Sequence, residues 1–116
     1  MKLINITTNI IISTKVEIAD TFFKRFIGLM GRKNMEREEV LVIKPCNNVH
    51  MFFMRFAIDV IFVDREDEIC YIQENLKPRQ ISKYMYDAIY VIELPVDRVR
   101  EKDIKVGDRL VIDLKK

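Results

Sequence analysis

The sequence predicts a mostly β (α+β) fold: a small antiparallel β-barrel or sandwich of about seven strands, with one short helix packed on it. Short runs rich in isoleucine and valine recur along the chain, as they do in strands. The turn signals between these runs have the spacing of all-β sandwiches and barrels. Only residues 20–30 carry a helical repeat of apolar side chains. A length of 116 residues suits one domain, so residues 1–116 are expected to fold as a single domain.

The strands are expected along the whole chain, each bounded by turn residues. Residues 3–6 and 10–12 predict a hairpin across a short polar turn, and residues 16–18 could extend its second strand. Proline cannot donate to a strand ladder, so Pro45 and Pro95 are expected to end two of the later strands. Further strands are expected at residues 39–44, 49–53, 58–64, 68–76, 88–94 and 109–114, with a loop at 77–86 and a helical turn within 96–104.

The helix is expected over about residues 20–30. Asp20 or Thr21 can cap its start by accepting a backbone N–H, and Gly31 can supply the left-handed conformation that closes its end. The apolar side chains at helical spacing are Phe22, Phe26 and Leu29, with Phe23, Ile27 and Met30 beside them.

Composition argues against several classes of function. Twenty basic and eighteen acidic residues are interleaved and give a net charge of +2, whereas nucleic-acid binding needs clustered positive charge. No apolar run approaches the roughly 20 residues of a membrane span, and no signal peptide is recognised. Cys46 and Cys70 are expected to be free thiols in a reducing cytoplasm. Many isoleucines, dense mixed charge and two glutamines are typical of thermophilic proteins.

Residues 45–64 carry most of the candidate chemistry. They hold the only histidine, His50, and they place Arg55 and Asp59 inside the most apolar stretch of the chain. Polar groups in such a run must be paired or functional, since burying them without partners is costly. Arg55 and Asp59 could pair in a forked contact that orients the interior. Alternatively, Arg55 could receive an anionic group of a ligand in a cleft, with Asp59 holding it in place.

Two further hypotheses use Cys46 with its neighbours. Cys46, His50 and Met54 lie at four-residue intervals and are soft ligands suited to copper(I) or zinc. Along a strand, however, such positions are about 13 Å apart, so only a tight loop could gather them and no metal or cofactor is expected. Cys46 and His50 could also act as a nucleophile and its base. No residue is assigned as catalytic.

An apolar surface of adaptable methionine and phenylalanine side chains could complete a ligand site. Its methionines and phenylalanines either fill the core or line an open pocket, since small barrels often hold a ligand at one mouth. The loop at 84–86 could lie over that pocket. Glu93 is a carboxylate in an apolar strand and a candidate for a shifted pKa; it could pair with Arg55 or act with Asp59. The soft residues are Met30, Met51, Met54, Met85, Phe22, Phe23, Phe52, Phe53, Phe56 and Phe62.

Four blocks, at residues 25–30, 50–64, 88–95 and 104–109, together resemble domain-of-unknown-function family 192 over nearly the whole chain. The resemblance implies a compact, mostly β fold with a short helix, and it implies no reaction. It also implies that Met54, Arg55 and Asp59 belong to the family pattern, as do residues 28–30. Cys46 and His50 look like features of one branch, and residues 55–57 depart from the Lys-Asn-Thr version of other members.

The sequence does not specify an activity, and an enzyme is not favoured. The first hypothesis is a cytoplasmic β-barrel binding module with a Met- and Phe-lined pocket, anchored by Arg55 and Asp59. Its partner would be an unknown small molecule or a protein segment, with no nucleic acid and no membrane. The alternatives are a metal-binding or thiol-dependent enzyme at Cys46 and His50, or a structural or accessory protein-interaction module. The candidate ligand-binding residues are Arg55, Asp59, His50, Met54 and Cys46.

Overall fold

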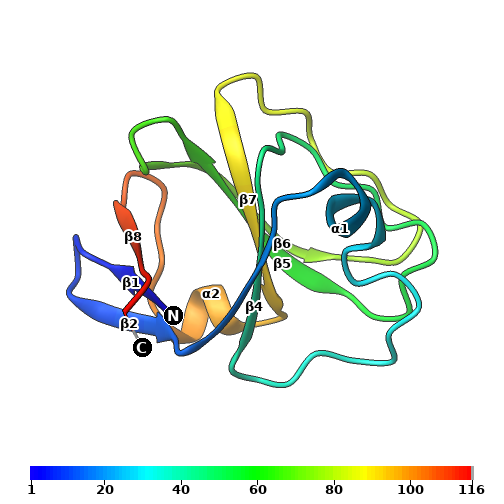
Figure 1. Cartoon of the computed structure of the whole chain (residues 1–116), viewed down its shortest axis with the longest axis horizontal. Coiled ribbons are helices and arrows are strands. Elements are labelled where there is room, and N and C mark those ends of the chain that lie inside the picture. The colour runs from blue at the N-terminus through cyan, green and yellow to red at the C-terminus, as the bar shows by residue number, and fades with distance from the viewer. Residues whose placement is uncertain (116) are drawn as a thin grey trace.

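The apolar runs form eight strands in two sheets, together with two short helices (Figure 1). The computed structural model describes residues 1–115; residue 116 and the side chain of Phe22, one of the expected helix residues, lie outside that description. The elements are β1 (Lys2–Asn5), β2 (Ile10–Ser13), β3 (Lys15–Ala19), α1 (Phe22–Ile27), β4 (Glu39–Ile43), β5 (Ile58–Asp64), β6 (Ile69–Leu76), β7 (Ala88–Pro95), α2 (Arg98–Glu101) and β8 (Leu110–Asp113).

The two sheets pack as a sandwich. One sheet has the strand order β2-β1-β8 and the other has the order β3-β4-β7-β5-β6. Figure 1 shows α1 on the opposite side of the five-stranded sheet from β1, β2 and β8. The central strands of that sheet are therefore covered on both faces, which explains why residues 58–63 are apolar almost without interruption and buried throughout.

Strand alternation divides the core into two clusters, one on each face of the five-stranded sheet. In β7, Ile92 and Leu94 pack into the cluster that meets the three-stranded sheet, together with Leu3 and Leu110. Val91 lies in the other cluster, on the α1 side of the sheet. The core on the α1 side is completed by loops rather than by a second sheet, and a pocket forms there.

The mostly β fold with a short helix is confirmed, and the sandwich alternative is the correct one. Within residues 1–115 the strands form two separate sheets and not a closed barrel. The chain bends at Thr14 and passes there from one sheet to the other. Residues 16–18 therefore do not extend β2. They belong to β3, which pairs in parallel with β4, and the crossover between these strands contains α1.

Two other expectations differ from the structure. The helix is confirmed but is shorter than expected, because Gly28 at φ +47° ends it three residues before Gly31. Residues 49–53 form no strand; His50 makes only an isolated bridge with Ile81. The chain turns here, because Met51 bonds through its backbone to residues 79 and 80 and Phe53 takes a positive φ of 66°. The helical turn expected within residues 96–104 is α2.

No helix among the described residues is long and apolar enough to cross a membrane.

Candidate functional site

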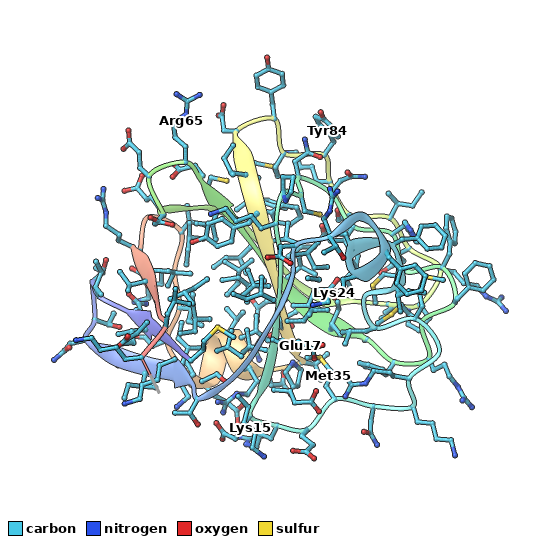
Figure 2. The ribbon with its side chains drawn as sticks, in the orientation of Figure 1. Lys15, Glu17, Lys24, Met35, Arg65 and Tyr84 are labelled. Carbon is cyan, nitrogen blue, oxygen red and sulfur yellow. The ribbon has the colours of Figure 1, made fainter. Side chains whose placement is uncertain are left out.

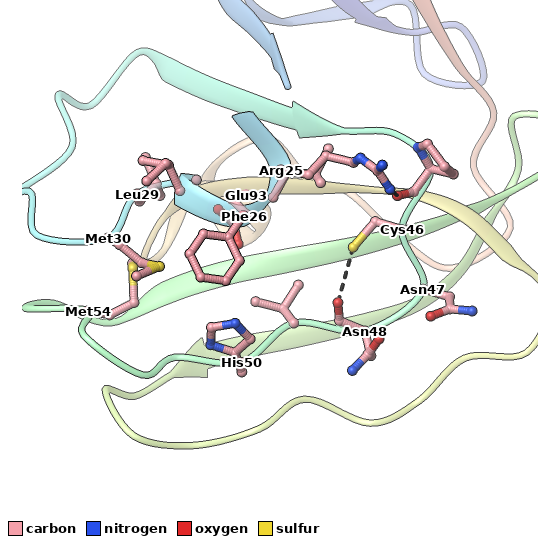
Figure 3. Close-up of a pocket in the computed structure, with 15 residues that line it drawn as sticks. Arg25, Phe26, Leu29, Met30, Cys46, Asn47, Asn48, His50, Met54 and Glu93 are labelled. Carbon is pink, nitrogen blue, oxygen red and sulfur yellow. Dashed lines mark hydrogen bonds between the residues drawn. The ribbon is translucent and has the colours of Figure 1, made fainter. Parts of the chain in front are cut away.

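A pocket of about 530 Å³ lies between α1 and the five-stranded sheet (Figure 3). We call it the α1 pocket. Its walls come from the end of α1 and the segment after it, from the loop between β4 and β5, and from single residues of β4 and β7. The lining residues are 25–30, 45–50, Ile43, Met54 and Glu93.

Local backbone contacts hold these walls in place. Thr21 caps α1 by accepting the Lys24 N–H at 3.1 Å, as predicted. The loop after β4 is fixed by a bond from the Cys46 N–H to the Ile89 carbonyl at 2.8 Å. The Gly31 N–H reaches the Phe53 carbonyl at 3.1 Å and joins the segment after α1 to the loop before β5. Two segments that are distant in the sequence, residues 25–30 and the loop between β4 and β5, thus converge with Glu93 of β7 on one cavity.

Glu93 is the one acidic residue in the pocket lining. It is only 4% exposed, and its register neighbours Leu41 on β4 and Val60 on β5 are apolar. No hydrogen bond or ion pair within residues 1–115 engages its carboxyl group. Every fully buried side-chain oxygen in the described chain has a partner, so the Glu93 oxygens must reach the pocket space. Burial alone raises the pKa of Glu93 to about 7.

Cys46 and His50 line the same pocket, but no contact between them is seen within the described chain. The Cys46 thiol donates to the Asn48 carbonyl at 3.1 Å. Burial raises the pKa of Cys46, and the charge of Glu93 adds to that effect. His50 is exposed and stacks on Phe52 at 5.4 Å between ring centroids. The arrangement does not create a reactive thiolate, which requires a lowered pKa. No three His, Cys, Asp or Glu side chains in residues 1–115 gather as a metal site.

Soft side chains form the apolar part of the lining. Met30 and Met54 lie at one end of the drawn pocket, and Arg25 reaches toward Cys46 at the other (Figure 3). Met51 is fully buried in the core and is not among the lining residues. The loop at 84–86 does not line the pocket either. Tyr84 is 61% exposed and lies at the outer edge of the molecule (Figure 2).

Arg55 and Asp59 do not form the expected pair. Arg55 is exposed, lies outside the pocket lining, and has no ion pair among the described side chains. Asp59 is 1% exposed, and its two oxygens accept the Asn75 N–H at 2.9 Å and the Val99 N–H at 3.3 Å. The second bond caps the start of α2, whose N-cap Asp97 makes no side-chain cap. Burial raises the pKa of Asp59, whereas the two bonds oppose that rise.

Asp59 and Glu93 also face opposite sides of the sheet. Asp59 is in register with Leu94, and Glu93 with Val60. Because alternate residues of a strand point to opposite faces, Asp59 lies on the face toward α2 and Glu93 on the face toward α1. They therefore cannot form one acid–base pair.

The family profile of domain-of-unknown-function family 192, described as "Uncharacterized ACR", matches residues 4–112. The chain belongs to this family. Relatives called UPF0127 proteins include one from Thermococcus sibiricus, 36% identical over 93% of this chain and 72% of its own length. Another, from Pyrococcus furiosus, is 36% identical over 93% of this chain and 95% of its own length. These source organisms are thermophilic archaea, in line with the composition.

A solved structure shares the family 192 fold seen here. It is a protein from Sinorhizobium meliloti named as a candidate transcription regulator, with a TM-score of 0.78 and 24% identity. The match covers 95% of this chain and 89% of that one. At this identity the likeness concerns the fold alone.

Sequence reasoning placed three of the lining residues of this family 192 chain among its candidates, namely Cys46, His50 and Met54. It assigned the charged anchor to Arg55, whereas the charged groups that line the pocket are Arg25 and Glu93. Glu93 was singled out from the sequence as a carboxylate inside the apolar run of β7 and a candidate for a shifted pKa, and its pKa is raised. Arg25 gave no signal, since a basic residue on a helix is ordinarily a solvated one.

Proposed function

We propose that this chain is a binding module for a small organic molecule, and that the α1 pocket is its site. The observation that carries the proposal is the Glu93 carboxyl, which is 4% exposed, has no partner within the described chain, and borders a cavity of about 530 Å³. A buried carboxyl without a partner destabilises a fold, and such groups are concentrated at functional sites. A ligand that satisfies Glu93 would remove that cost.

The rest of the lining supports a ligand rather than a reaction. The volume suits a small organic molecule, and the thioethers of Met30 and Met54 can adapt to its shape. The raised pKa of Cys46 disfavours a thiol-dependent enzyme. Free thiols at Cys46 and Cys70 fit a reducing compartment, and the cytoplasm stays our expectation.

A protein segment is the second candidate partner. Phe23 on α1 and Phe53 in the loop before β5 are 72% and 75% exposed, and Phe53 also has a positive φ. A bulky residue rarely keeps that conformation without a reason, and such strain is concentrated at functional sites. A partner covering these rings would bury apolar surface beside the pocket. Neither nucleic acid nor a membrane is proposed as a partner.

Disulfide tethering tests the proposal, because the chain carries its own matched control. Cys46 lines the pocket and Cys70 does not, yet both thiols are half-buried and both have a pKa raised by burial. The protein is incubated with a library of fragment disulfides under mild reduction, and capture at each cysteine is measured by mass spectrometry. We expect Cys46 to capture a chemically related subset of fragments. Equal capture at both thiols, regardless of the fragment, would contradict the proposal.

A further inference from the structure

We infer that the ligand of the α1 pocket carries an organic ammonium group that binds the Glu93 carboxylate, on a mainly apolar body. The inference rests on the proposed function and adds the chemical class of the ligand. It starts from the position of the carboxyl group, which is buried, has no partner within residues 1–115, and borders the cavity.

The strands beside Glu93 supply no charge to it. Leu41 on β4 and Val60 on β5 are its register neighbours, and both are buried apolar side chains. The same face of the sheet continues as an apolar cluster that includes Val91. The sheet thus supplies no counter-charge to an ionised Glu93, and burial is the sole cause of its raised pKa.

The other titratable or charged groups around the pocket are Arg25, Cys46 and His50. The Arg25 guanidinium donates to the carbonyls of Thr21 and Pro45, both at 3.3 Å, and lies at one edge of the pocket (Figure 3). It does not contribute to the pKa of Glu93. The Cys46 thiol is directed to the Asn48 carbonyl, and His50 is exposed and stacked on Phe52. None of these groups neutralises Glu93.

An alkylammonium fits this environment better than the other ligand classes. It supplies a positive charge and three N–H donors to a carboxylate that has neither. Its apolar body can contact the methionines of the lining. A carboxylate ligand would place a second negative charge beside a buried one, and an apolar ligand would leave Glu93 unsatisfied. A metal ion would need more ligands than the described side chains gather around this position.

Three probes of similar size test the inference: 2-phenylethylamine, 2-phenylethanol and 3-phenylpropionate. Their dissociation constants are measured by NMR titration of the full chain at about pH 8, where Glu93 is ionised. Hydrogen bonds between charged groups are stronger than hydrogen bonds to a neutral group. We therefore expect the amine to bind about tenfold more tightly than the alcohol, and the carboxylate to bind most weakly. In Glu93→Gln the advantage of the amine should fall to about twofold or less, while Glu66→Gln, which removes an exposed carboxylate outside the lining, should preserve it.

The pH dependence of the affinity for the amine provides a second test, which needs no variant. An alkylammonium stays protonated between about pH 5.5 and 8, as lysine does, so Glu93 is the group that titrates. With a pKa of about 7, most of the carboxyl is protonated at pH 5.5, so the affinity for the amine should fall about fivefold from pH 8 to pH 5.5, to near that of the alcohol. The affinity for the alcohol should change little.

Two results would overturn the inference. One is an amine that binds no more tightly than the alcohol at about pH 8; the other is no saturable shift with the amine up to its solubility limit. Either would leave the proposed function to be decided by tethering at Cys46, because that experiment does not depend on the charge of the fragment. Failure of tethering together with failure of all three probes would remove both proposals.

Discussion

At the scale of single residues, two buried carboxylates of the same sheet have opposite roles. Asp59 accepts two backbone N–H groups and fixes the start of α2, so its burial is compensated. Glu93, on the other face, has no such donors within the described chain. The difference follows from strand alternation, which turns one side chain toward α2 and the other toward the α1 pocket. We therefore assign stability to Asp59 and ligand binding to Glu93.

The stability of the protein should depend on pH through Glu93. Its pKa is about 7 in the fold against an ordinary value of 4.5, so the folded state holds its proton to higher pH than the unfolded state does. The free energy of unfolding should therefore fall by about 3 kcal/mol from this group as pH rises from 4.5 past 7. Urea unfolding of wild type and Glu93→Gln across this range measures the effect. The variant should lose this decrease, whereas Glu66→Gln should keep it; equal slopes in all three proteins would refute the assignment.

Substitutions of Asp59 and Arg55 should distinguish a buried residue that stabilises the fold from an exposed residue that does not. Asp59→Asn replaces an acceptor of two buried N–H groups with an amide, and we expect a loss of about 2–3 kcal/mol in the free energy of unfolding. Arg55→Ala removes an exposed side chain and should change it by about 0.5 kcal/mol or less. Chemical denaturation measures both. A loss at Arg55→Ala as large as that at Asp59→Asn would show that Arg55 has a buried partner after all.

At the scale of elements, local sequence patterns predicted where the strands lie better than which strands pair with each other. The strands at 39–43, 58–64 and 88–95 were predicted within one residue, because apolar runs ended by proline or charge are strong local signals. The parallel pairing of β3 with β4 was not predictable, since it depends on a crossover through α1. Residues 49–53 were wrongly predicted as a strand, because only Val49 and Met51 pack into the core from a loop, whereas Phe52 and Phe53 are exposed.

The end of α1 should be sensitive to its glycine. Gly28 has φ +47° and ψ −123°, a conformation that residues with a Cβ atom strongly disfavour, and its N–H bonds to the Lys24 carbonyl. Gly28→Ala should therefore lower the free energy of unfolding by about 1–3 kcal/mol. Because Gly28 lines the pocket, fragment capture at Cys46 should change while capture at Cys70 does not. A variant with unchanged stability and unchanged capture would argue against this account of the helix end.

At the scale of the whole molecule, the sandwich creates the pocket by covering the two faces of one sheet differently. The three-stranded sheet covers one face, and α1, the segment after it and the loop between β4 and β5 cover the other and leave a cavity. The loop between β4 and β5 places Cys46, His50 and Met54 along the wall of one pocket. Sequence patterns could identify these residues as candidates, but not the loop path that joins them to Glu93.

The joining of the first and last strands in the three-stranded sheet should depend in part on one long-range side-chain contact. The Asn5 amide donates to the Asp108 carboxylate at 2.8 Å, and both side chains are buried between β1 and the turn before β8. Asn5→Ala removes one of the two donors to that carboxylate, the other being the Lys105 N–H at 2.9 Å, so we expect a loss of about 1–2 kcal/mol in the free energy of unfolding. A double-mutant cycle with Asp108→Ala measures the coupling. Additive effects of the two substitutions would show that the contact does not stabilise the fold.

The central claim is that Glu93 is a buried carboxyl without a protein partner, held open to a ligand. The most direct measurement is the pH titration of its side-chain carboxyl carbon by NMR, with the resonance assigned by its loss in Glu93→Gln. The account predicts a midpoint near the raised pKa of about 7 in the free protein. A midpoint near the ordinary glutamate value of 4.5 would contradict it, because the group would then be solvated or paired.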